Sequence, residues 1–199
     1  MQVYRKVHLV PFGEFVPGRH SVPLLARIVG DQVPGDFKAG NEFTVFSLTN
    51  SDVQVAPLIC FEDTIGELVR KFVLPSETSL GANLLVDITN DGWFLHSAGS
   101  HQHLANAIFR CVETRRPMVR AANTGVTCFV NQFGRVTQVL LDDTGSTFTE
   151  GVLTGEINVP TEHDLTFYTR HGELFAKICA AITAVAILIV FGMRRSKHV

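Results

Sequence analysis

An α/β fold followed by one apolar C-terminal helix is the architecture that the 199-residue sequence predicts. Two observations support it. Short apolar, β-branched runs alternate with helical patterns and then give way to a series of strands, an order typical of layered α/β or α+β packing. Residues 178–193 carry no charge at all, which is typical of a helix that crosses a membrane. We therefore expect a sandwich of sheets flanked by helices, with an apolar helix after it.

The first half of the chain is expected to alternate between helices and strands. Pro11, Gly13, Pro17 and Gly18 interrupt residues 7–20, which predicts a loop. The remaining elements of this half are a short helix at 22–29, strands at 43–48 and 53–59, a helix at 64–74 that ends at Pro75, and a buried strand at 83–88.

The second half begins with a helix and continues with strands. Leu104, Ile108 and Cys111 are spaced three and four residues apart, which predicts a helix over 101–114 with an apolar face. Apolar runs bounded by turn residues then predict four strands, at 118–122, 127–131, 135–141 and 151–159.

The segment 174–193 is predicted to cross a membrane. A spanning helix needs about 20 apolar residues, and this segment reaches that length if Lys177 extends its amine towards the lipid headgroups. Arg194 and Arg195 follow it, and a basic flank marks the cytoplasmic side. We therefore expect a basic cytoplasmic tail at 194–199 and a domain at 1–173 on the opposite side. A buried core helix is the alternative.

Composition excludes one class of function. Seventeen Lys and Arg residues stand against nineteen Asp and Glu, giving a net charge of -2, so the excess of positive charge typical of nucleic-acid binding is missing.

The mean hydropathy of +0.20 is high for a fully soluble domain. Residues 1–10 lack the apolar run of a signal peptide, so we expect transmembrane sequence upstream of this chain.

Cys60 differs from the other cysteines in its setting. It follows the strand at 53–59 and precedes a helix, so it lies at an elbow where exposure and the helix dipole favour the thiolate. Cys111, Cys128 and Cys179 fall on a helix face, in a strand and in the apolar segment, where cysteine acts as a small hydrophobic residue. On this pattern alone, a core position is an alternative for Cys60 too.

Ordinary interpretations also exist for the other chemically active residues. Lys6 and Glu14 lie in a loop, where such side chains are usually solvated, although Glu14 is the only acid among residues 1–30. His101 and His103 stand two apart on a predicted helix, which points their rings in different directions, so no metal site is expected.

Four segments together resemble a known family. YRKVHLVPFGEFVP, PLICFE, NDGWF with the following HQH, and RCVETRRPMVRAANTG are similar in order and spacing to the nitrilase (carbon–nitrogen hydrolase) domain of apolipoprotein N-acyltransferases. The resemblance covers nearly the whole chain and continues through TFYTRHGELFA into the apolar helix. It implies a nitrilase-like αββα sandwich at 1–173, partial because its early strands are missing, followed by one transmembrane helix.

A Glu–Lys–Cys triad is the catalytic machinery that this resemblance implies. Cys60 corresponds to the nucleophile, and Lys6 to the lysine that stabilises the oxyanion of the tetrahedral intermediate. Glu62 resembles the acidic residue that supports the site beside the cysteine. Acyl transfer needs a thiolate, a base and positive charge where the oxygen becomes negative, so the chemistry agrees with these roles.

Three further residues correspond to parts of the family's substrate site, and one part is absent. Glu14 resembles a carboxylate near the lysine loop, and Trp93 and Phe94 resemble residues that line the approach. The base of the triad is a glutamate well upstream of Lys6, before this chain begins. We therefore expect the chain to be a fragment that is inactive alone, with half of a split enzyme as the alternative.

The reaction implied by the resemblance is a two-step acyl transfer. Cys60 takes an acyl chain from a membrane phospholipid as a thioester, and the N-terminal amine of a diacylglyceryl-cysteine lipoprotein then accepts it in a water-poor site. No metal or organic cofactor is needed. The expected location is the bacterial inner membrane, with the catalytic domain on the periplasmic side. A membrane-tethered amidase that hydrolyses C–N bonds and an inactive lipoprotein-binding remnant are the alternatives.

Overall fold

A mixed six-stranded sheet forms the centre of the computed structural model, which describes residues 2–18, 37–77 and 79–196. The strands lie in chain order: β1 (Phe46–Ser47), β2 (Gln54–Ile59), β3 (Leu84–Asn90), β4 (Met118–Asn123), β5 (Cys128–Val130) and β6 (Val136–Val139). Strands β2, β3 and β4 are parallel to one another, whereas β1, β5 and β6 are antiparallel to their neighbours. The predicted α/β class is therefore confirmed.

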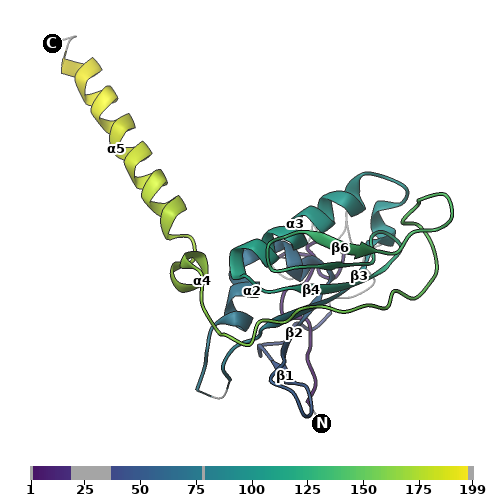
Figure 1. Ribbon diagram of the computed structural model, residues 1–199. Helices are drawn as coiled ribbons and strands as arrows, with labels where there is room; N and C mark the ends of the chain where they lie inside the picture. The colour runs from purple at the N-terminus through teal and green to yellow at the C-terminus, as the bar shows by residue number, and fades with distance from the viewer. Residues whose placement is uncertain (1, 19–36, 78, 197–199) are drawn as a thin grey trace.

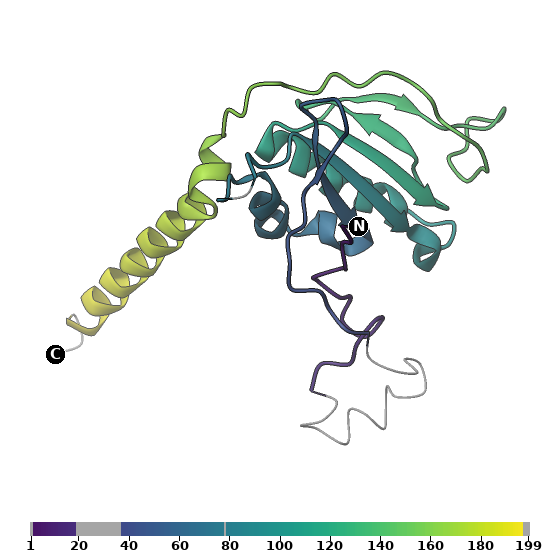
Figure 2. The same cartoon turned by 90° about the horizontal axis from the view of Figure 1, so that it is seen from below.

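Two helices connect the parallel strands. The helix α2 (Gly66–Val73) links β2 to β3, and α3 (Gly99–Thr114) links β3 to β4; Figures 1 and 2 show both on one side of the sheet. A short 3-10 turn precedes each helix: η1 (Cys60–Thr64) and η2 (Asp91–Phe94). Because the carboxyl ends of parallel strands meet at one edge of a sheet, the two turns lie at the same edge.

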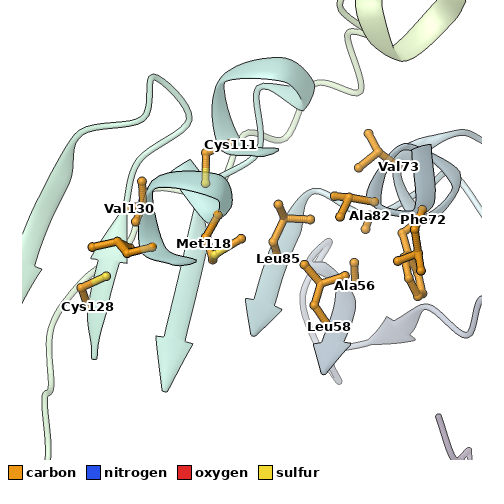
Figure 3. Packing of buried hydrophobic residues seen from close by; sticks show 14 of the residues in the cluster. Ala56, Leu58, Phe72, Val73, Ala82, Leu85, Cys111, Met118, Cys128 and Val130 are labelled. Atoms are coloured by element: carbon orange, nitrogen blue, oxygen red, sulfur yellow. The ribbon is translucent and has the colours of Figure 1, made fainter. Parts of the chain in front are cut away.

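The hydrophobic core lies between the sheet and these helices. Figure 3 shows Leu58, Leu85 and Met118 pointing from three adjacent strands towards the helices, where Phe72 and Cys111 meet them. All five side chains are buried. The core therefore fixes the position of β2 and β3, whose ends carry the two turns.

The other face of the sheet is also apolar but only partly covered. Ile88 in β3 is 54% exposed, and it lines a wide cavity on this face together with Val119 and Phe129. Parallel sheets are normally buried on both faces. This face of the sheet therefore has the composition of a surface that packs against another layer.

An extended segment runs from β6 back along the sheet to α4 (Figure 2). The strand expected at 151–159 is wrong: these residues are described and form no strand. The segment is held instead by side chains that bond its carbonyl oxygens, because Asn83 Nδ2 donates to Pro160 O at 3.1 Å and Arg116 Nη2 donates to Asp164 O at 3.2 Å.

The other boundaries differ less from expectation. The strand expected at 43–48 shrinks to β1 at Phe46–Ser47, because only these two residues pair with β2. Two expected helices and five expected strands are present with one or both ends shifted. The helices were expected at 64–74 and 101–114, and the strands at 53–59, 83–88, 118–122, 127–131 and 135–141. The helix expected at 22–29 lies outside the described residues.

The C-terminal helices lead away from the sheet. The short helix α4 (Phe167–His171) is followed by α5 (Leu174–Ser196), which projects from the rest of the protein in Figure 1. The stretch Leu174–Phe191 has a mean hydropathy of 2.6 and none of it is buried. By length and composition α5 is able to cross a membrane, and Leu174–Phe191 is not buried as a core helix of this domain would be.

Candidate active site

Cys60 lies at the junction of β2 and η1, where the elbow was predicted. Its φ angle is 55°, a left-handed conformation that costs a non-glycine residue roughly 1–3 kcal/mol. Strained strand-to-helix turns present nucleophiles in other enzymes. Cys60 is partly exposed, whereas Cys111 and Cys128 are buried, and burial raises the pKa of the Cys128 thiol to about 11. The elbow thiol is therefore the accessible one of these three.

Glu62 anchors the elbow from behind. Its side chain is fully buried, and its Oε2 accepts a hydrogen bond from Ile59 N at 2.9 Å. Its Oε1 accepts three more, from Tyr4 Oη at 2.8 Å, Val7 N at 2.7 Å and His8 N at 3.1 Å. One carboxylate therefore joins the end of β2 to the loop on either side of Lys6.

The loop itself holds an ion pair. Lys6 Nζ lies 2.8 Å from Glu14 Oε1, and the side chains are 10% and 26% exposed. The second oxygen of Glu14 accepts a hydrogen bond from Val10 N at 2.8 Å. Because both carboxylate oxygens are engaged, the position of the Lys6 ammonium is fixed by its own loop.

Two cavities meet at the elbow. One of about 990 Å³ extends over the open face of the sheet, and the other, of about 610 Å³, lies between the lysine loop and α3. Cys60, Glu14 and Trp93 line both, whereas Phe94 lines only the smaller one. The walls of both are mainly apolar, so the thiol faces space suited to hydrocarbon on two sides.

The predicted site residues thus fall into two groups. Cys60, Glu14 and Trp93 come together around the cavities, and Lys6 joins them through Glu14. Glu62 lines neither cavity and bonds to backbone amides and a tyrosine.

A buried charge cluster beneath the elbow was not found from the sequence. It consists of Arg120 in β4, Asp63 in η1, Asp91 in η2 and His103 in α3. Arg120 Nη1 donates to Asp63 Oδ2, and Arg120 Nη2 donates to Asp91 Oδ2 at 3.3 Å. Asp87 in β3 contacts Arg120 Nη1 from the sheet.

Protonation in this cluster follows from its geometry. Burial by itself would lower the pKa of His103, but hydrogen bonds to Asp63 and Asp91 outweigh burial and raise it to about 10. Burial would also raise the pKa of Asp91, yet His103 and Arg120 hold it below its ordinary value. Burial and then the charge of Asp63 raise the pKa of Asp87 well above its usual range.

Two signals in the sequence point to this cluster in retrospect. Arg120 and Asp87 interrupt apolar strand runs at positions that alternate with exposed ones, and a charge at such a position needs a partner. His101 is exposed and His103 is buried, as the helical spacing predicts. Among the residues that the structure describes, no group of three potential ligands is arranged to hold a metal.

Residues 1–166 match the protein family described as carbon-nitrogen hydrolase. The chain is 38% identical over 193 residues to the apolipoprotein N-acyltransferase of Geobacter metallireducens, covering 97% of this chain and 34% of that protein. It is also 38% identical over 199 residues to that of Chlorobaculum tepidum, covering 98% and 35%. The chain therefore spans about a third of the length of the curated relatives it matches.

Solved structures are more distant. A carbon-nitrogen hydrolase from Helicobacter pylori superimposes with a TM-score of 0.49 at 14% identity, over 61% of this chain and 45% of that one. An amidase from a Nesterenkonia species superimposes with a TM-score of 0.44 at 19% identity, over 69% and 46%.

Proposed function

The chain belongs to the carbon–nitrogen hydrolase family, and from that premise we propose that it forms the catalytic part of a lipoprotein N-acyltransferase. It moves an acyl chain from a membrane phospholipid to the N-terminal amine of a diacylated lipoprotein. The similarity to named apolipoprotein N-acyltransferases supports this choice within the family. The observation that carries it is the position of Cys60 between two apolar cavities.

The first step is acylation of Cys60. The Cys60 thiol gives its proton to the general base, and the Sγ thiolate attacks the ester carbonyl of the phospholipid to form a C–S bond. The tetrahedral oxyanion then collapses, the ester C–O bond breaks, and the leaving oxygen takes the proton from the base and departs as a lysophospholipid. Lys6 stabilises the oxyanion, and one such donor typically contributes about 10²–10³ in rate. Glu14 holds the Lys6 ammonium at 2.8 Å, so the positive charge is in place before substrate arrives.

The second step transfers the acyl group. The amine of the diacylglyceryl-cysteine attacks the thioester, an amide bond forms, and the Cys60 thiolate leaves. The amine proton goes to the general base, the role that the family pattern gives to a glutamate upstream of Lys6. Two apolar cavities at one thiol fit a sequence of acylation followed by transfer. The acyl chain on Cys60 occupies one cavity, and the incoming diacyl lipid occupies the other. Trp93, which lines both, separates the two chains, and Phe94 covers the smaller cavity.

Membrane attachment fits the same proposal. The stretch Leu174–Phe191 of α5 is apolar and exposed, and the basic residues that follow it in the sequence mark the cytoplasmic side. The catalytic domain of residues 1–173 then lies on the periplasmic face of the bacterial inner membrane. There it meets both substrates, which are lipids or lipid-anchored.

A pair of matched serine variants tests the proposed function. The full-length gene product is placed in membranes with radiolabelled phospholipid and a diacylated lipopeptide, and the triacylated product is measured. Cys60→Ser should abolish transfer, whereas Cys128→Ser, a buried cysteine in β5, should retain most of it. Residual transfer by Cys60→Ser would remove the nucleophile from the proposal. Hydrolysis of small amides without transfer would support the amidase alternative. If the wild-type protein carries out neither transfer nor hydrolysis, the inactive remnant is supported.

A further inference from the structure

Two turns that shape the proposed site depend on one buried histidine. The turn η1 carries Cys60 and η2 carries Trp93, and each turn contributes one buried carboxylate, Asp63 and Asp91. His103, from α3, lies between these carboxylates. Its Nε2 is 2.8 Å from Asp63 Oδ1, and its Nδ1 is 2.7 Å from Asp91 Oδ1.

A carboxylate oxygen facing each ring nitrogen favours a doubly protonated ring. Ionised carboxylates only accept hydrogen bonds, and an imidazole donates from both nitrogens only as the imidazolium. Asp63 and Asp91 balance His103 and Arg120, whose Nη2 lies 3.1 Å from His103 Nδ1. The two turns are therefore joined by charge-assisted bonds, which are roughly twice as strong as neutral ones.

The same ring reaches the surface of the smaller cavity. His103 is 5% exposed and lines this cavity with Cys60 and Phe94. Its ring packs edge-on against Phe94, with the ring centroids 5.7 Å apart at 72°. A shift of His103 would thus move the cavity wall and both turns together.

Both turns need such a tie because a strained residue begins the first and directly follows the second. Cys60, which begins η1, has φ 55°, and Leu95, which follows η2, has φ 51°. Left-handed conformations of this kind persist only where surrounding contacts hold them. Thr89 Oγ1 adds a bond of 3.0 Å to Asp91 Oδ1.

We propose that His103 is a positioning residue for acyl transfer: it ties the Cys60 turn to the Trp93 turn, so that the nucleophile and the cavity wall keep one relative geometry. This inference rests on the proposed function for its catalytic consequence. Its structural part, the coupling of the two turns, stands without that function.

The test compares His103→Gln with Asp87→Asn in the full-length protein. Glutamine cannot donate to carboxylates on opposite sides of the ring position. Asp87→Asn is the matched control, because Asp87 is equally buried and contacts Arg120 but belongs to neither turn. The first measurement is amide hydrogen exchange of the peptides that contain 60–64 and 91–95, with a peptide of α2 as reference.

His103→Gln should speed exchange about ten-fold or more in both turns and leave α2 unchanged, and Asp87→Asn should change neither turn by more than about two-fold. In transfer assays, His103→Gln should lower kcat about ten-fold while KM for phospholipid stays within about two-fold. Faster exchange across the whole sheet, unchanged exchange in either turn, or equal losses in both variants would overturn the proposal.

Two outcomes keep this inference separate from the proposed function. If the wild-type protein transfers no acyl chain, the transfer reaction fails, while the exchange comparison still decides whether His103 couples the turns. If His103→Gln does not accumulate, Thr89→Val removes only the hydroxyl that donates to Asp91. It should then speed exchange about three-fold in 91–95 with α2 unchanged, and no change there would count against the coupling.

Discussion

Replacing Glu62 with glutamine should both destabilise the protein and impair transfer, although it exchanges one oxygen for a nitrogen. The buried carboxylate accepts hydrogen bonds from Tyr4, Val7 and His8 at one oxygen and from Ile59 at the other. A glutamine can place its oxygen where three donors converge. Its NH₂ group then faces the Ile59 N–H, so two donors meet and one bond is lost.

The size of the effect follows from these contacts. A hydrogen bond to a charged group contributes about 1.5–3 kcal/mol and one between neutral groups about 0.5–1.5 kcal/mol. Losing the Ile59 bond and weakening the other three should therefore cost about 3 kcal/mol, because such bonds are not additive. For a protein of this size, each 1 kcal/mol lowers Tm by about 2–4 °C, which predicts a fall of about 6–12 °C. The Lys6 loop should also shift relative to Cys60, lowering the transfer rate about 10²-fold.

Thermal unfolding and initial transfer rates measure both effects. Glu67→Gln is the matched control, because Glu67 lies on α2 in an exposed ion pair with Arg70, and such pairs contribute at most about 1 kcal/mol. The control should keep its Tm within about 4 °C and retain full activity. A Glu62→Gln protein that melts and transfers like the control would refute the assignment of Glu62 as the anchor of the elbow.

Three further predictions concern charge and thiol access. Lys6→Met should lower thioester formation by about 10²–10³-fold, measured in single-turnover experiments; a loss below ten-fold would remove Lys6 from the oxyanion role. A small alkylating reagent should label Cys60 in the folded protein and Cys128 only after denaturation, as followed by mass spectrometry, and equal native labelling would contradict the accessible elbow. Burial and the charge of Arg120 would lower the pKa of His103, but the hydrogen bonds to Asp63 and Asp91 raise it from 6.5 to about 10. The stabilisation that these bonds give is therefore complete below about pH 6.5 and is lost as pH rises through 10. Tm should therefore fall between pH 7 and 10.5 by more in the wild type than in His103→Gln, and parallel pH profiles would show that His103 is not the group responsible.

Much of the fold could be predicted because its signals are local. Cys60 was placed at an elbow because an apolar strand ends beside it, and α3 followed from apolar residues three and four apart. The expected strand at 151–159 failed for the opposite reason. Its apolar residues resemble a strand, but the extended segment to which it belongs is held at Pro160 and Asp164 by Asn83 and Arg116, which are far away in the sequence.

In the site, too, local motifs could be recognised from the sequence, whereas contacts between distant residues could not. The motifs around Lys6, Cys60 and Trp93 identified which residues gather near the cavities. The partners of Glu62 lie 54 to 58 residues away on the loop, and no spacing rule predicts such a contact. Arg120 and His103 could not be paired with carboxylates before the sheet order was known, because the edge where η1 and η2 meet is a product of the parallel topology.

The most direct test of the account is detection of the acyl-enzyme. The full-length protein is incubated in membranes with labelled phospholipid, and the peptide that contains Cys60 is examined for a hydroxylamine-sensitive acyl group. The proposed mechanism predicts an adduct on Cys60 that disappears when a diacylated lipopeptide is added, with equal label appearing on the lipopeptide amine. Transfer of label to the lipopeptide without any adduct on Cys60, or an adduct that is not passed on to the amine, would contradict it.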